Sequence, residues 1–527
     1  MKNIKKFFFN AIILCAVSML MRTVGVSFNV YVSNRAGAEA MGLYALLSSV
    51  YGFSVTFATS GINFATMRLV AKALGKNDYN EASAALKNCI IYGIVFSSAA
   101  SIALFSCSDF IGIKILRDKR TVLSLKILAA TLVPISLSSV FNGYFTAVKR
   151  VYKNAVIQVC EQAVKIFAIS SLLSLMLPKG IEFACAALAL GGGISEMFSF
   201  LLSAFVFFLD KRKAIKIKRD EKNYSYVTTD LMRTALPIAS SAYARSGLIS
   251  LEHMLIPIGL LKYGLNKSHS LSLYGIIQSM VLPIVLFPAA LISSFSGLLV
   301  PELTECTVKK SHRQIRYICE RSLQLALIFS IGTAGIMICF SGELGNVIYP
   351  NKNTSLYIKL LAPLIPIMYI DTTVDHMLKG LGEQFYSMIV NIADALLSVF
   401  LVWFLLPHFG IIGYIITIYI SELINASLSI VRLMKKSGFK THLTKWIIKP
   451  LLCVAGATCL SNIIFSHAKQ LFNSSAISLI IHIAFTLFSY VLMLIATNSF
   501  DKEDVLWVSK IFKNEKSIKS YTRNYSS

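Results

Sequence analysis

Two arginines and their neighbours are the residues of this sequence whose types and spacing could do chemistry. Arg22 lies in the apolar stretch VSMLMRTVGVSFNVYV, and Asn29 falls on the same helix face. Arg245 lies in SAYARSGLISLEHMLIP, where Glu252 shares its face. A guanidinium keeps its charge and pairs bidentately with phosphate oxygens. We therefore expect these four residues to line a water-filled central cavity that binds an anionic group such as a diphosphate; a structural ion pair or a snorkelling side chain is the alternative.

The composition explains why such arginines are unusual. The chain has 527 residues, of which 55% are hydrophobic and only 15% are charged, as in integral membrane proteins. An arginine inside a spanning helix costs at least ~2.5–3.5 kcal/mol, so it needs water, an anion or a carboxylate. The net charge of +25 comes mostly from short loops between apolar runs, so we expect no nucleic-acid partner. The ten cysteines have no paired spacing, and we expect no metal site.

About fourteen apolar runs are long enough to span a bilayer. Lipid cannot satisfy open strand edges, so the sequence predicts an all-α polytopic membrane protein. Basic short loops place both termini on the cytoplasmic side of a bacterial cytoplasmic membrane, although one basic loop, KILRDKR, falls outside. The runs are roughly 7–32, 41–64, 88–108, 122–146, 155–177, 182–208, 231–261, 273–300, 320–343, 355–378, 384–407, 409–431, 446–466 and 476–498.

The chain reads as two similar halves. In each half an intramembrane arginine comes first, then a Leu-Tyr helix start, and then a Leu-x-Pro-Ile helix. This order predicts two six-helix lobes, related by a pseudo-twofold axis along the membrane normal, with two further helices appended. The predicted parts are an N-terminal lobe 1–208, a basic cytoplasmic linker 209–230, a C-terminal lobe 231–432, spans 13 and 14 at 433–498, and a basic cytoplasmic tail 499–527.

Several acids also fall within the predicted spans. Asp371 and Asp375, in DTTVDH, could bind a coupling cation or proton, or could cap and pair near the interface. Glu196, Asp394 and Glu422 stand singly. Each is a candidate coupling site, a partner for an arginine, or a protonated core group.

Two basic segments lie on the predicted cytoplasmic side. Arg68 belongs to SGINFATMRLVAKALGKNDYNEA, an amphipathic continuation of the second span, and Arg150 to the turn between the fourth and fifth. They could receive a phosphate at a cytoplasmic entrance, or serve only as topological anchors. The basic tail makes anionic membrane lipids an expected partner.

The order and spacing of four segments resemble a known family. The segments are RTVGVSFNVYVSNRAGAEAMGLYALLSSVYGF, GINFATMRLVAKALGKND, NGYFTAVKRVYKNAVIQVCEQAVKI and KGLGEQ. They resemble the polysaccharide-transporter branch of the MOP flippase superfamily, in particular the stage V sporulation protein B group and, more distantly, the lipid II flippases. The resemblance implies two lobes in a V, alternating access and a sugar substrate on undecaprenyl diphosphate. Arg22 matches the first-helix arginine of the flippase cavity, and Arg245 matches a second-lobe arginine loosely.

These features favour a flippase for a lipid-linked oligosaccharide, serving cell-envelope polysaccharide, peptidoglycan or spore-wall synthesis. We expect no enzyme and no cofactor, because no bond need be made and no Walker motif occurs; H⁺ or Na⁺ is the candidate coupling ion. Envelope-synthesis enzymes are candidate partners. The alternatives are a cation-coupled multidrug exporter of the same superfamily, a membrane glycosyltransferase or ligase, which would need a large external loop, and a scaffold without transport activity.

Overall fold

The computed structural model describes residues 2–76, 78–214, 225–349, 352–439, 441, 443–468, 475–497 and 499. Helices make up nearly all of these residues, and no strand occurs among them. Eleven helical stretches in this part of the chain are long and apolar enough to cross a membrane. The predicted all-α, multi-pass fold is therefore confirmed. The centre of the predicted linker and the tail beyond Ser499 lie outside the described residues.

The chain packs as two compact units. Unit 1 comprises Met1–Thr23, Val281–Val390 and Glu422–Ser527, and unit 2 comprises Val24–Met280 and Asn391–Ser421. This division reflects which helices pack together, whereas the predicted lobes rest on repeated sequence order. The lobe boundaries therefore stay a prediction.

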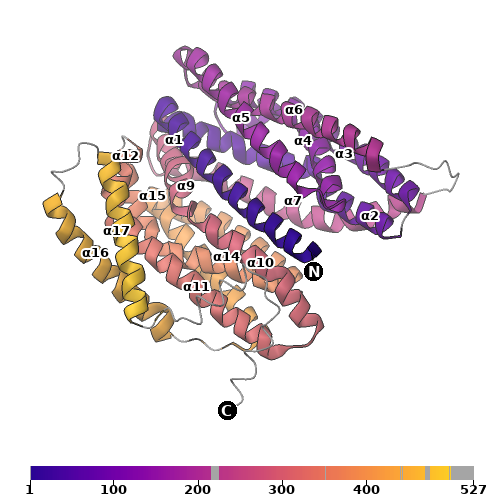
Figure 1. Cartoon of the computed structure of the whole chain (residues 1–527). Helices are drawn as coiled ribbons and strands as arrows, with labels where there is room; N and C mark the ends of the chain where they lie inside the picture. The colour runs from indigo at the N-terminus through magenta and orange to yellow at the C-terminus, as the bar shows by residue number, and fades with distance from the viewer. Residues whose placement is uncertain are drawn as a thin grey trace. The chain divides into compact units, whose positions relative to one another are not determined.

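Unit 2 is built on neighbouring helices from the first half of the chain. Its helices are α1 (Lys2–Thr59) from Val24 onward, α2 (Ile62–Gly75), α3 (Tyr79–Phe110), α4 (Val122–Ala147), α5 (Val151–Met176), α6 (Ile181–Ala214), α7 (Ser225–Lys262) and α8 (Lys267–Gly275). α4 packs against α3, α5 and α6 (Figure 1). Buried rings fill the core between them, among them Tyr144 and Phe207 with centroids 4.9 Å apart. The middle of α15 (Gln384–Ser437) completes the unit.

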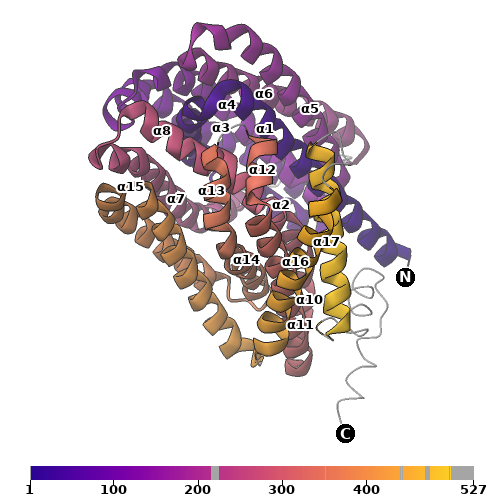
Figure 2. The same ribbon diagram turned by 90° about the vertical axis from the view of Figure 1, so that its left-hand side faces the viewer.

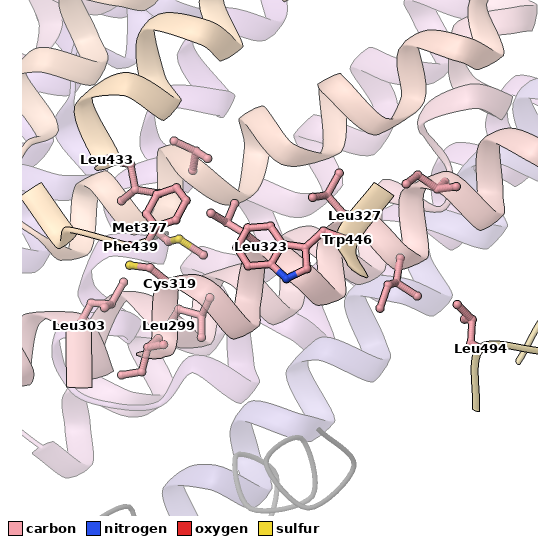
Figure 3. Close-up of a cluster of buried hydrophobic side chains, with 14 of the residues drawn as sticks. Leu299, Leu303, Cys319, Leu323, Leu327, Met377, Leu433, Phe439, Trp446 and Leu494 are labelled. Atoms are coloured by element: carbon pink, nitrogen blue, oxygen red, sulfur yellow. The ribbon is translucent and has the colours of Figure 1, made fainter. Parts of the chain in front are cut away.

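Unit 1 has its own core around α11 and α14. Its helices include α9 (Leu282–Leu286), α10 (Ala289–Val308), α11 (His312–Cys339), α12 (Ser341–Ile348), α13 (Lys352–Leu361), α14 (Ile365–Gly380), α16 (Lys449–Ala468) and α17 (Ser475–Ala496). α14 packs on α10 and α11, and α16 packs on α17 (Figure 2). Leu323, Met377 and Trp446 meet in the buried cluster of Figure 3. This cluster joins the last two predicted spans to the rest of the unit.

Glycines mark where two long helices bend. α1 is interrupted at Gly37 (φ 82°, ψ 166°), between the predicted spans 7–32 and 41–64. α15 is interrupted at Gly410 (φ 57°, ψ −137°), between the predicted spans 384–407 and 409–431. Side chains strongly disfavour such backbone angles. Each helix therefore supplies two predicted spans, while the total of fourteen stays a prediction.

Within unit 2, α1 and α8 approach each other closely through glycines. A Cβ on Gly42 would lie 1.9 Å from the Leu271 carbonyl oxygen. One on Gly275 would lie 2.2 Å from the Ala38 carbonyl oxygen and 2.5 Å from the Gly42 nitrogen. Small residues permit such backbone contact between membrane helices, where dispersion rather than the hydrophobic effect drives association.

An ionic network lies beside this glycine contact. Arg120 donates to Glu39 at 3.0 Å and to Asp118 at 2.8 Å, and Lys267 lies 3.2 Å from Asp118. Ser268 donates to the second Glu39 oxygen. Burial opposes ionisation of Asp118, but hydrogen bonds from Arg120 and Lys267 outweigh it and hold the pKa of the carboxyl below its ordinary value. Glu39 of α1 and the loop's own Asp118 thus partly neutralise the basic KILRDKR loop.

Replacing Gly275 with alanine should push α1 and α8 apart and destabilise the protein by about 1–3 kcal/mol. Gly52→Ala is the matched control, because a Cβ there meets nothing within 4 Å. Thermal unfolding of both variants in one detergent measures the effect. Equal midpoints for the two variants would contradict the close approach.

Asp118→Asn should destabilise the protein in a pH-dependent way. A carboxyl whose pKa falls on folding stabilises the fold above its unfolded pKa, near 3.9, and that stabilisation disappears as the pH drops through the lower folded pKa. We expect the wild-type protein to unfold at a higher temperature than the variant near neutral pH. The gap between them should close below about pH 4. A gap that does not change with pH would show that Asp118 does not act through its charge.

Candidate functional site

The predicted eighth span, 273–300, is not one continuous helix. α8 passes into a π-helix, η4 (Ile276–Val281), which is followed by the short α9, and α10 begins only after Pro288. Pro283 and Pro288 have no N–H, so each leaves the carbonyl four residues earlier without its usual partner. In a bilayer, neighbouring side chains must satisfy such carbonyls.

The predicted polar face of α1 supplies two side-chain donors to this broken span. Asn29 Nδ2 donates to the Ser279 carbonyl oxygen at 2.7 Å, four residues before Pro283. Arg22 Nη2 donates to the Leu286 carbonyl oxygen at 3.0 Å. Each contact lies within one unit, the first in unit 2 and the second in unit 1. The two side chains predicted to bind a headgroup therefore also complete the backbone hydrogen bonding of the broken span.

Tyr369, on α14, is inserted into the break in unit 1. Its hydroxyl donates to the Val285 carbonyl oxygen at 2.8 Å. In an unbroken helix that carbonyl would accept from the N–H of Ala289. The side chain is fully buried, so the hydroxyl acts as a fixed wedge between α9 and α10.

The Leu286 carbonyl is left without a helical partner for a related reason. The N–H of Ala290, which would reach it in a regular helix, bonds the Phe287 carbonyl at 3.2 Å. Arg22 takes that place with one of its N–H groups, and the guanidinium is exposed. No salt bridge to Arg22 occurs among the described residues, so an anion can approach the guanidinium without first displacing a carboxylate.

In unit 2, α7 holds Arg245 through a seam of hydroxyl contacts with α1. Ser250 donates to the Ser49 carbonyl oxygen at 2.6 Å, and Thr56 donates to Ser246 at 3.2 Å. Arg245 itself is exposed. Hydroxyl contacts of this kind are weak one by one, but together they fix which face of α7 carries the arginine.

Glu252 and Asp394 form a carboxylate pair in unit 2. The charge of Asp394 acts on Glu252, and the charge of Arg245 acts on Asp394. Ser421 donates a hydrogen bond to Asp394. Glu252 has neither a hydrogen bond nor an ion pair among the described residues. Acids within electrostatic reach of each other favour a protonated member or a bound cation.

Glu196 has a different neighbourhood in the same unit. It is half-buried on α6, and the charges of Glu161 and Lys165 on α5 act on it. Ser199 donates to Glu161 at 2.7 Å. Glu196 is thus a second intramembrane acid near another acid, Glu161, and here Lys165 of the same neighbouring helix lies within electrostatic reach as well.

The acids predicted in unit 1 lie among polar partners. Asp371 accepts from Asn425 at 3.3 Å, and Asp375 pairs with Lys379 at 2.6 Å and accepts from a serine on α15. Glu422 is half-buried on α15. This neighbourhood favours, for Asp375, pairing near the interface over ion coupling. Across the described residues, no group of three or more His, Cys, Asp or Glu could hold a metal ion.

The two predicted entrance arginines lie in unit 2. Arg68 is exposed on α2, and Arg150 is half-buried where α4 ends and α5 begins. The Arg150 backbone N–H bonds the Phe145 carbonyl at 2.8 Å, which closes the turn. A phosphate-receiving role for either side chain stays a prediction.

Sequence reasoning missed the main-chain partners of Arg22 and Asn29. The spacing of Pro283 and Pro288 inside a predicted span was the available signal, because two missing N–H groups must leave acceptors unsatisfied. Tyr369 carried no comparable signal, since a tyrosine in an apolar helix is ordinary core material. The closeness of Glu252 and Asp394 depends on packing between distant segments.

Known proteins share this chain's sequence features. The model of a family described as polysaccharide biosynthesis protein matches residues 8–305, more than half of the chain. Stage V sporulation protein B of Bacillus subtilis is 27% identical over 77% of this chain and 79% of its own length. Sporulation protein YkvU of the same organism is 20% identical over 68% of this chain and 79% of its own length.

Solved structures share the fold at low sequence identity. The lipid II flippase MurJ, in an inward closed conformation, gives a TM-score of 0.66 at 14% identity, covering 92% of this chain and 98% of that one. An inward-facing multidrug resistance MATE transporter of the MOP superfamily gives 0.62 at 15% identity, covering 81% and 99%. The fold is thus that of MOP transporters, and the chain belongs to the polysaccharide biosynthesis protein family.

Proposed function

We propose that this protein is a flippase that moves a lipid-linked sugar, carried on a prenyl diphosphate, across the bacterial cytoplasmic membrane by alternating access. The observation that carries the proposal is Arg22, an exposed guanidinium in an apolar helix whose bond to the Leu286 carbonyl uses one N–H group. A charge within an apolar spanning helix is strongly stabilised by an anion. Membership in a polysaccharide biosynthesis family supports a sugar-bearing substrate.

The physical task is to carry a charged head across about 30 Å of hydrocarbon. The diphosphate would lose its hydration, so the protein must offer donors in place of water. In the proposal Arg22 and Arg245 bind phosphate oxygens, and Asn29 binds the sugar or the diphosphate. The prenyl chain needs no such help, because it stays in lipid throughout.

The carboxylate pair Glu252 and Asp394 is the best-supported candidate for coupling in this proposal. Each acid lies within electrostatic reach of the other, and Arg245 lies within reach of Asp394. A proton or Na⁺ that neutralised the pair would change the field around Arg245, and with it the affinity for phosphate. Glu196 is a secondary candidate on the same grounds.

The carboxylate pair is also compatible with one alternative function, that of a cation-coupled multidrug exporter. That function would place carboxylates at the binding site and would favour organic cations. Mid-span arginines on α1 and α7 disfavour it, because they repel a cationic drug.

We further propose that both termini face the cytoplasm and that the basic tail binds anionic lipids, with envelope-synthesis enzymes as partners.

Arg22→Ala and Arg245→Ala should each weaken binding of undecaprenyl diphosphate at least about tenfold, because a hydrogen bond to a charged group is worth about 1.5–3 kcal/mol. Native mass spectrometry of the purified protein measures the bound fraction, with undecaprenol as the uncharged comparison. Arg313→Ala, an exposed arginine at the start of α11, is the control. Undiminished binding in both test variants would rule out the proposed headgroup site.

Glu252→Gln and Asp394→Asn should abolish the response of transport to an imposed H⁺ or Na⁺ gradient, because each variant removes one of the two charges that share the ion. Headgroup binding should persist. Proteoliposomes with a labelled undecaprenyl-diphosphate sugar provide the assay, and Glu305→Gln, an exposed acid paired with Lys309, is the control. Variants that still follow the gradient as the wild type does would exclude this pair from coupling.

A further inference from the structure

We propose that Arg22 exchanges between two acceptors, the Leu286 carbonyl and a phosphate of the headgroup, and that this exchange makes the break at Pro288 a hinge that responds to substrate. Pro288 and Tyr369 are then positioning residues for transport. The inference rests on the proposed function, since it needs an anionic headgroup, but it concerns how binding is converted into movement of α10.

The first step is that the Leu286 carbonyl depends on Arg22. The Ala290 N–H bonds the Phe287 carbonyl instead, and the neighbouring Val285 carbonyl accepts from the Tyr369 hydroxyl. Within the described residues, Arg22 is the donor that reaches Leu286. A carbonyl is a weaker acceptor for a guanidinium than a phosphate, because the phosphate carries a negative charge and can accept two N–H groups at once. An arriving phosphate therefore competes for the guanidinium.

The second step is what the carbonyl does once it is released. The nearest helical donor in sequence is the N–H of Ala290, four residues on. Taking that donor would draw α9 and α10 toward a continuous helix and change the angle between them. Pro288 opposes this closure because it lacks an N–H and its ring crowds the preceding turn. The break can thus stay open without substrate and shift when the anion arrives.

Tyr369 sets the starting geometry. Its hydroxyl donates to the Val285 carbonyl, which in a continuous helix would accept from the Ala289 N–H. Because the ring is fully buried against α10 and α11, the wedge is fixed by unit 1 itself. α14 therefore decides where the hinge lies.

Pro288→Ala tests the exchange directly. Alanine lets α9 run into α10, so Leu286 recovers a helical donor and Arg22 no longer has to leave a carbonyl to bind phosphate. Undecaprenyl diphosphate should bind roughly three- to tenfold more tightly than to the wild-type protein, while transport of a labelled undecaprenyl-diphosphate sugar in proteoliposomes is lost. Pro301→Ala, inside α10 and away from the break, is the matched control and should leave both quantities unchanged.

Tyr369→Phe keeps the ring and removes the hydroxyl. Like Pro288→Ala, it should tighten binding of undecaprenyl diphosphate and reduce transport, but by smaller factors. It decides the matter if Pro288→Ala does not fold. Tighter binding together with lost transport supports the hinge, because a merely structural defect would weaken both. Wild-type-like transport, or weaker binding, in a folded Pro288→Ala or Tyr369→Phe variant overturns it. Failure of the wild-type protein to prefer undecaprenyl diphosphate over undecaprenol would instead overturn the proposed function.

Discussion

Inside a bilayer a backbone carbonyl has no water to accept from, and this constraint organises the broken span from α8 to α10. Pro283 and Pro288 interrupt this span, and side chains from other helices donate to three of its carbonyls. Asn29 donates to the Ser279 carbonyl, which Pro283 leaves without its usual partner. Tyr369 and Arg22 donate to the Val285 and Leu286 carbonyls, at the end of α9. The polar face of α1 is therefore required by the fold before any substrate is considered.

The same requirement explains why the chain accepts the energetic cost of placing Arg22 in the membrane. An asparagine or a tyrosine could satisfy a carbonyl without bringing a permanent charge into the membrane. A guanidinium can donate to a carbonyl or to a phosphate, and it pairs more strongly with the phosphate. The arginine thus links the backbone of a broken helix to an anionic ligand, which a neutral donor would do poorly.

The fold class could be predicted from the sequence, because runs of apolar residues of bilayer length have one solution, the helix. The helix face shared by Arg22 and Asn29 was also predictable, since it follows from 3.6 residues per turn. Their partners were not, because the Leu286 and Ser279 carbonyls lie more than two hundred residues away in the chain. The pairing of Glu252 with Asp394 depends in the same way on how α15 packs. The acid that pairs with Arg120 in the basic loop, Glu39, was not predictable either, because it is remote in sequence.

The central claim is that one guanidinium exchanges between a backbone carbonyl and a phosphate. An electron cryomicroscopy structure of the protein in a nanodisc with undecaprenyl diphosphate tests it most directly. Our account predicts a phosphate oxygen about 2.8 Å from the Arg22 guanidinium, and a Leu286 carbonyl that has left Arg22 for a helical donor. A phosphate bound elsewhere, with Arg22 still on Leu286, would contradict it.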